Sequence, residues 1–385
     1  MGTENPIVDM SQTPGGRPIQ MVDLKGQYLR IRPEIDAAIS EVLMESAFIQ
    51  GRQVKEFAGD LASYTGSVHV IPCANGTDAL QIAMMALGLK PGDEVILPVH
   101  TYVATAEVIA LLGLKPVFTD VHADSFNLDA SGLDRLVTPR TKAVVPVHLY
   151  GQCADMEPIL GFARRHGLFV IEDSAQALGA VYTFSDGTRR QAGTMGAFGT
   201  TSFFPSKNLG GYGDGGAIFT QDAELAEKAR IIANHGQRKK YHHEIVGVNS
   251  RLDTLQAAIL KVKLKHLPDY ERRRQAAAAF YDRALTGIAQ LVIPFRSPNS
   301  SHVFHQYTLR VSDRDALRSH LEQQGVPTMI YYPVPLHRQE AYRSADSFPV
   351  SEELSATVIS LPIHTEMDEE VLTYICDSIR TFYHG

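Results

Sequence analysis

Between residues 67 and 220, short apolar runs rich in β-branched residues alternate with segments of helical period. Such alternation predicts an α/β domain, in which helices cover both faces of a mostly parallel sheet. One run, Leu168–Glu172, is apolar nearly throughout, which is typical of a central strand buried on both faces. The expected strands are near Val68–Cys73, Glu94–Val99, Lys115–Val121, Lys142–His148, Leu168–Glu172, Thr200–Phe204 and Ala217–Thr220. The expected helices between the early strands are Ala79–Leu87, Val103–Leu112 and Pro158–His166.

The pattern changes after about residue 250, where Leu252–Leu267 has helical period and Pro268, followed by Arg272–Arg274, lies in the next long helical stretch. The elements expected beyond are strand Phe304–Val311, helix Arg314–Gln324, strand Thr328–Tyr332 and helix Glu369–Phe382. We therefore expect a large domain over residues 21–265 and a small α+β C-terminal domain over residues 266–385. Residues 1–20 are rich in Gly, Pro, Ser, Thr and Gln without a period, which indicates a mobile tail.

Charge and cysteine usage exclude several classes of protein. The formal net charge of −7 argues against nucleic acid or an anionic membrane as a partner, because both attract basic surfaces. No apolar run approaches the ~18 residues of a membrane-spanning helix. Three widely spaced cysteines form neither a disulfide framework nor a zinc ribbon, and they favour a reducing cytoplasm. No H-E-x-x-H or C-x-x-C motif is present, so no metal site is expected.

Lys207 lies between an aromatic strand and a glycine-rich turn, within the segment Thr200–Gly216. Burial there would lower the lysine pKa, and a neutral amine can form a Schiff base. The alternative is a surface lysine in a turn. The glycines match G-x-G-x-x-G, but the segment that follows, Ala217–Thr220, reads as a strand rather than a helix. A dinucleotide site is therefore rejected.

Two further segments follow strand ends. Asp173 ends the buried strand, where open α/β sheets bind ligands, and its carboxylate could hold a metal, a ribose or a cationic ring nitrogen. The alternative is a helix N-cap. Thr77 and Asp78 begin an apolar helix after an Asn-Gly turn, and a helix N-terminus binds anions such as phosphate. The alternative is simple capping by either residue.

Two other polar segments are candidate ligand contacts. Asn249 and Arg251 lie in an otherwise apolar stretch ahead of a helix, and an arginine can clamp a carboxylate or phosphate. The alternative is an ordinary surface arginine. Tyr331 and Tyr332 precede a proline-rich segment and could line a sugar or nucleotide pocket. The alternative is tyrosine packing inside the small domain.

One ligand could bind all three candidate groups. It would need a carbonyl for Lys207, a basic ring nitrogen for Asp173 and a phosphate for the helix terminus at Thr77. Pyridoxal 5′-phosphate (PLP) has all three. An ionised Asp173 would keep the ring nitrogen protonated, which makes the ring an electron sink. Lys207 would then act as the base that moves the proton between the donor's α-carbon and the cofactor.

From about Met21 onward, the sequence resembles the DegT/DnrJ/EryC1/StrS nucleotide-sugar aminotransferases, which have the aspartate-aminotransferase fold type I. The motifs that carry the resemblance are Ala74–Ala79, Thr101–Thr105, Glu172–Gln176, Ser202–Lys207 and Gly247–Arg251. Within the family, the chain is most similar to enzymes that aminate UDP-2-acetamido-2-deoxy-3-oxo-glucuronate at position 3. Those enzymes act in the synthesis of surface polysaccharides, including lipopolysaccharide.

The resemblance implies a homodimer with shared active sites, and it implies a role for each candidate residue. Lys207 would bind PLP, Asp173 would pair with its ring nitrogen, Gln176 would contact the ring or its hydroxyl, and Tyr102 would stack on it. The implied phosphate contacts are Gly76, Thr77 and Ser202, joined by Asn249 of the other subunit. The implied substrate contacts are Arg251, Tyr331 and Tyr332.

The sequence thus predicts a PLP-dependent transaminase that moves nitrogen from glutamate to a keto nucleotide sugar. Some relatives are sugar dehydratases with histidine at the lysine position, and Lys207 argues against that reaction. A 4-keto sugar or another ketosugar is an alternative acceptor. A non-catalytic PLP-binding regulator is an alternative of another class.

Overall fold

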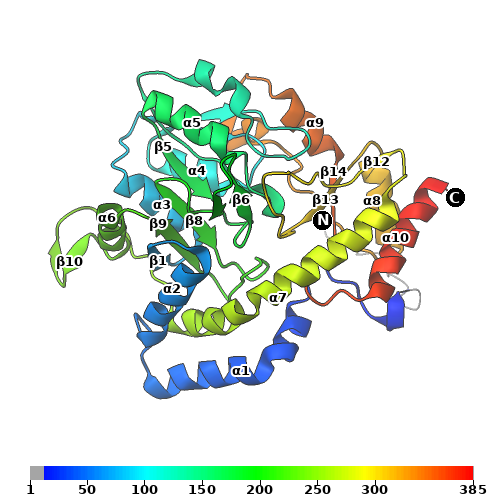
Figure 1. Cartoon of the computed structure of the whole chain (residues 1–385), viewed down its shortest axis with the longest axis horizontal. Coiled ribbons are helices and arrows are strands. Elements are labelled where there is room, and N and C mark those ends of the chain that lie inside the picture. The colour runs from blue at the N-terminus through cyan, green and yellow to red at the C-terminus, as the bar shows by residue number, and fades with distance from the viewer. Residues whose placement is uncertain (1–12, 385) are drawn as a thin grey trace.

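A computed structural model describes residues 13–384, and its large domain is built on one seven-stranded sheet (Figure 1). The strand order is β1-β9-β8-β5-β4-β2-β3. Only β9 runs against its neighbours, so the predicted mostly parallel α/β sheet is confirmed. The strands are β1 (His69–Cys73), β2 (Glu94–Pro98), β3 (Lys115–Thr119), β4 (Thr141–Val144), β5 (Phe169–Asp173), β8 (Phe198–Ser202) and β9 (Gly216–Thr220).

Helices cover both faces of this sheet because successive strand residues point to opposite sides. One face packs on α3 (Gly76–Ala86), α4 (Ala104–Leu111) and α6 (Ala223–Ala233). The other face packs on α2 (Arg52–Thr65), α5 (Met156–His166) and the first half of α7. In β5, for example, Ile171 faces the first set of helices and Val170 faces the second.

Helix α7 (Thr254–Leu285) connects the two parts of the chain, as Figure 1 shows. Pro268 lies inside this single helix, so the predicted interruption after Leu267 is wrong. The first half of α7 packs in the core of the large domain, and residues from Ala277 onward pack in the core of the small domain. The expected domain boundary, at residues 265 and 266, therefore lies within a continuous helix. Helix α1 (Leu24–Glu45) packs along α7.

The small domain contains a three-stranded sheet, with order β12-β13-β14, and three helices. Its elements are β12 (Leu291–Val292), β13 (Tyr307–Val311), α8 (Arg314–Gln323), α9 (Pro349–Thr357), β14 (Val358–Leu361) and α10 (Glu369–His384). The predicted strand Thr328–Tyr332 is wrong, because only Met329 forms an isolated bridge, with Ser360. Of the predicted mobile tail, residues 1–12 lie outside the described residues, whereas Ile19 is buried against the small-domain core.

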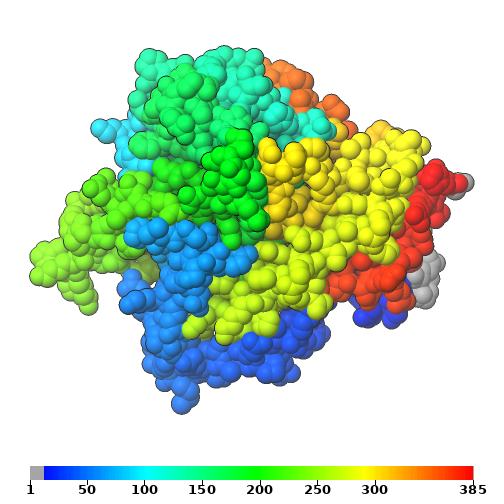
Figure 2. Space-filling view, viewed as in Figure 1, coloured from blue at the N-terminus to red at the C-terminus, as the bar shows by residue number. Residues whose placement is uncertain are grey.

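Two hairpins complete the fold, and one of them projects from the molecule (Figure 2). They pair β6 (Val181–Thr183) with β7 (Arg189–Gln191), and β10 (Gln237–Lys239) with β11 (His242–His243). The β10–β11 hairpin is the projecting one. Short 3-10 turns are η2 (Pro14–Gly16), η3 (Ala130–Leu136), η4 (Leu149–Gly151), η5 (Leu336–Arg338) and η6 (Glu340–Tyr342). None of the helices in residues 13–384 combines the length and the apolar character needed to cross a membrane.

Candidate active site

The carboxyl ends of the neighbouring strands β5 and β8 bring Lys207 and Asp173 together. Asp173 is the last residue of β5 and is paired with Thr200 of β8. Lys207 lies in the turn after β8, where its N–H donates to the Phe204 carbonyl oxygen at 2.8 Å. Burial of the amine lowers the pKa of Lys207 to about 8, against the opposing attraction of the Asp173 carboxylate. Lys207 is half-buried, so the structure favours a lysine within a site over a surface lysine in a turn.

Two donors hold the carboxylate of Asp173, which is only 7% exposed. Oγ1 of Thr105, on α4, donates to Oδ2 at 2.9 Å, and the N–H of Ala175 donates to Oδ1 at 3.2 Å. After Asp173 the chain turns towards β6 without forming a helix, so the alternative of a helix N-cap is wrong. The carboxylate is therefore oriented by its neighbours while it faces Lys207 closely enough to interact with it electrostatically.

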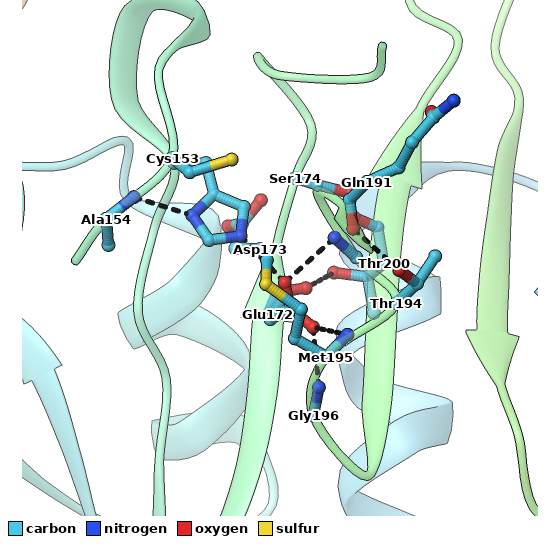
Figure 3. A network of polar contacts seen from close by, with 12 residues as sticks. Cys153, Ala154, Glu172, Asp173, Ser174, Gln191, Thr194, Met195, Gly196 and Thr200 are labelled. Atoms are coloured by element: carbon cyan, nitrogen blue, oxygen red, sulfur yellow. Dashed lines mark hydrogen bonds and ion pairs between the residues drawn. The ribbon is translucent and has the colours of Figure 1, made fainter. Parts of the chain in front are cut away.

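The adjacent Glu172 points to the other face of β5 and anchors the chain behind the site (Figure 3). Its Oε1 accepts the N–H groups of Met195 and Gly196, both at 2.6 Å. Its Oε2 accepts the N–H of Gly193 and Nε2 of His148, both at 2.9 Å. Because four donors converge on a carboxylate without solvent exposure, β5 is tied to the loop that precedes β8.

The N-terminus of α3 meets the end of β8. The Asn75 side chain caps this helix by accepting the N–H of Asp78 at 2.8 Å, so the alternative in which Thr77 or Asp78 caps it is wrong. A Cβ atom on Gly76 would lie 2.8 Å from Cβ of Ser202, so only glycine allows this approach without a shift. Three candidate phosphate contacts, Gly76, Thr77 and Ser202, therefore lie around one helix terminus, which favours an anion.

Aromatic side chains from both domains form the opposite wall. Tyr102 follows β2 and is 57% exposed, with its ring centroid 6.1 Å from that of Tyr332. The Nε2 of Gln176 donates to the Tyr332 hydroxyl at 3.1 Å. Tyr331 and Tyr332 therefore lie against residues of the large domain, and the alternative of packing inside the small domain is wrong.

Asn249 and Arg251 do not join Lys207 within one chain. Arg251 donates to Oδ1 of Asn234 at 3.3 Å, and it lines a cavity of about 340 Å³ together with Arg230 and Arg238. None of the residues around Lys207 lines this cavity. Asn249 is exposed beside it, in a bridge to Asn234. In a single chain these two candidates therefore form a separate surface.

Thr105 contacts Asp173 but was not assigned a role from the sequence, and Tyr150 and His100, which contact Tyr331 and Tyr332 from behind, were also left unassigned. Thr105 lies in the motif Thr101–Thr105, and a hydroxyl at the start of the helix that follows a strand was the available signal. Tyr150 contacts Tyr331, which lies 181 positions later in the chain, so no local pattern could reveal the contact.

A model of the DegT/DnrJ/EryC1/StrS aminotransferase family matches residues 29–380, which is most of the chain. The chain belongs to this family. A curated relative from Pseudomonas aeruginosa, UDP-2-acetamido-2-deoxy-3-oxo-D-glucuronate aminotransferase, is 48% identical over 94% of this chain and 99% of its own. A "pleiotropic regulatory protein" of Geobacillus stearothermophilus is 47% identical over 95% of this chain and 98% of its own.

Solved structures agree with this membership. The structure of DesV from S. venezuelae is similar with a TM-score of 0.92 and 41% identity, covering 96% of this chain and 99% of that one. Other relatives are named as transaminases of dTDP-sugars. The protein is therefore a sugar aminotransferase of the α/β class.

The aminotransferases of this family depend on PLP, and one similar structure holds its amino form, PMP. The residues of this chain fit that cofactor. The amine of Lys207 has a lowered pKa of about 8, and Asp173 is a buried carboxylate beside it. Gly76, at the N-terminus of α3, packs closely against Ser202. A carbonyl, a ring nitrogen and a phosphate would thus each meet a suitable group.

Proposed function

We propose that this chain transfers an amino group from glutamate to the 3-keto group of UDP-2-acetamido-2-deoxy-3-oxo-glucuronate, in the synthesis of surface polysaccharide. The observation that carries the chemistry is the Lys207 amine, whose pKa is lowered to about 8 beside the buried carboxylate of Asp173. An amine with a pKa of about 8 is partly neutral near physiological pH, and a base whose pKa lies close to the working pH is suited to proton transfer.

Some residues of the site would bind the cofactor, and others would transfer protons. When bound, PLP supplies a carbonyl and an electron-withdrawing ring. Lys207 would hold and release a proton at Nζ. Asp173, oriented by Thr105, would hold the proton of the ring nitrogen. Tyr102 would cover one ring face, and Gln176 would contact the ring edge from its place beside Tyr332.

The phosphate would lie at the N-terminus of α3. Backbone N–H groups there point outward and the helix dipole favours an anion. Thr77 adds a hydroxyl, and Ser202 adds another from the end of β8. These contacts leave the tyrosine side of the site for the sugar.

The sugar acceptor is proposed from the 48% identity to the Pseudomonas aeruginosa enzyme. The test is a panel of acceptors offered to the glutamate-treated protein: the UDP-3-keto-glucuronate, a dTDP-3-keto sugar and a dTDP-4-keto sugar. Amino-sugar product from the UDP acceptor at the highest kcat/KM supports the proposal. A higher kcat/KM with a dTDP acceptor contradicts the sugar assignment and keeps the transaminase chemistry.

A regulatory function is the second candidate, because the Geobacillus stearothermophilus relative carries that name. A regulator without catalysis would bind PLP and yet release no 2-oxoglutarate from glutamate. Amino transfer at a defined stoichiometry would exclude it.

We further propose a homodimer in which Asn249 and Arg251 serve the partner's site. Two observations support this arrangement. Neither residue reaches Lys207 in its own chain, and the neighbouring surface is apolar and exposed. Ile49 forms an isolated β-bridge with Asp253. Its side chain is exposed, as are those of Leu43, Met44 and Phe48 nearby in the sequence. A partner that covers this surface would receive Arg251 as a contact for a carboxylate.

The three buried cysteines are unpaired, which agrees with the cytoplasm as the proposed location.

A further inference from the structure

Tyr150 is a buried residue to which no role has been given, and its backbone conformation is unusual. It lies in η4, the next element after β4, with φ of 57° and ψ of 1°. A left-handed conformation is disfavoured for a bulky side chain and persists only where the surroundings impose it. The phenol ring packs edge-on against Phe126, with centroids 5.2 Å apart. The contacts that hold this residue therefore need an explanation.

The hydrogen bonds of its N–H and hydroxyl lead to the tyrosine wall of the site, which Tyr102, Tyr331 and Tyr332 form. The N–H of Tyr150 donates to Oε1 of Gln176 at 2.8 Å, so the amide of Gln176 must present its Nε2 to Tyr332. The carbonyl oxygen of Tyr150 accepts the N–H of Gln306 at 3.2 Å. The hydroxyl of Tyr150 donates to the carbonyl oxygen of Tyr331. One residue of the large domain thus orients both tyrosines.

His100 completes this arrangement from the end of β2. Its Nε2 lies 3.2 Å from the Tyr150 hydroxyl. Because the single hydroxyl proton is directed to Tyr331, the hydroxyl oxygen accepts a hydrogen bond from the Nε2–H of His100. Burial lowers the pKa of His100 to about 4, so the ring is neutral and has one N–H to donate. The His100 ring also meets that of Tyr332 edge-on, with centroids 6.2 Å apart.

We propose that Tyr150, supported by His100, is a positioning residue that fixes Tyr331 and Tyr332 on the sugar side of the site and so determines affinity for the acceptor. This inference rests on the proposed function, because it assumes that the tyrosine wall receives the sugar. The hydrogen bonds of Tyr150 go to Gln176, Tyr331 and His100, so it leaves proton transfer in the glutamate half-reaction to Lys207 and Asp173.

The test is Tyr150→Phe, which keeps the ring and removes only the hydroxyl. The matched control is Tyr281→Phe in the small-domain core, where a fully buried hydroxyl donates to the Pro362 carbonyl oxygen at 2.9 Å. We expect Tyr150→Phe to raise the KM for the acceptor about threefold to tenfold, the value of one hydrogen bond. The rate of 2-oxoglutarate release from glutamate should stay at the wild-type value. His100→Phe should show a smaller rise of the same kind, and Tyr281→Phe none.

A second measurement does not depend on activity. Amide hydrogen exchange of the cofactor-free protein should become faster across residues 329–334 in Tyr150→Phe and unchanged there in Tyr281→Phe. The inference is overturned if the acceptor KM and the exchange of this segment match the wild type, or if Tyr281→Phe shifts them equally. If wild-type protein releases no 2-oxoglutarate, the proposed function fails while the exchange result still decides the role of Tyr150.

Discussion

Replacing Glu172 with glutamine should destabilise the protein far more than its chemical similarity suggests. Gln keeps one oxygen, which can serve the N–H groups of Met195 and Gly196. Its NH2 group then faces the N–H of Gly193 and Nε2–H of His148, two donors that need an acceptor. His148 cannot offer its other tautomer, because its Nδ1 already accepts the N–H of Ala154 at 3.0 Å.

Two hydrogen bonds to a charged acceptor are lost, at about 1.5–3 kcal/mol each, so the free energy of unfolding should fall by about 3–6 kcal/mol. The matched control is Glu94→Gln, another buried glutamate. Its donors are side chains, namely the hydroxyls of Thr138 and Thr141 and the exposed cations of Lys115 and Arg140. The hydroxyls can rotate to accept from the new NH2 group, and exposed ion pairs contribute about 0–1 kcal/mol.

The assay is the midpoint of thermal unfolding of the cofactor-free proteins, with the rate of 2-oxoglutarate release measured on the loaded ones. Glu172→Gln should lower the midpoint several times more than Glu94→Gln. It should also slow the release, because Asp173 follows Glu172 on the same strand. Equal midpoints for the two variants, or a Glu172→Gln midpoint equal to the wild type, would refute the reasoning.

Thr105→Val keeps the side-chain shape but removes the donor to Asp173, and it should slow 2-oxoglutarate release about tenfold or more, with the unfolding midpoint as control. The uptake of PLP by cofactor-free protein can be followed by absorbance. Its rate should rise with pH up to about 8 and then level, because only the neutral Lys207 amine reacts. A rate that does not change with pH would contradict the lowered pKa. Mixing Lys207→Ala with Arg251→Ala protomers should restore activity in the hybrid dimer if each site is shared, whereas no activity would place Arg251 in its own chain's site.

The sequence predicts the sheet and the positions of Lys207 and Asp173 because both depend on local signals. The β5 strand is apolar on both faces, and residues that follow neighbouring parallel strands meet at one edge of the sheet. The order of β1, β8 and β9 within the sheet was not predicted. It depends on pairing between residues 69–73 and 216–220, which no local pattern encodes.

The small domain was less predictable for the same reason. Residues 328–332 have the composition of a strand, yet side chains of Tyr150 and Gln176 from the large domain hold Tyr331 and Tyr332. The strand β14 follows α9 directly, since Thr357 ends the helix and Val358 begins the strand, so no turn residue marks the change. In α7, proline at position 268 is accommodated within a long helix that is packed along both cores.

The central claim is that Lys207 is the amine that binds the cofactor and moves the proton when this protein transfers nitrogen from glutamate. The most direct measurement is the visible absorption of PLP-loaded protein before and after glutamate is added, together with the 2-oxoglutarate released. We expect the wild-type protein to be yellow and to bleach as it releases one 2-oxoglutarate per protomer. The Lys207→Ala protein should release 2-oxoglutarate far more slowly than the wild type. Equal release by both proteins, or yellow wild-type protein that glutamate leaves unchanged, would contradict the claim.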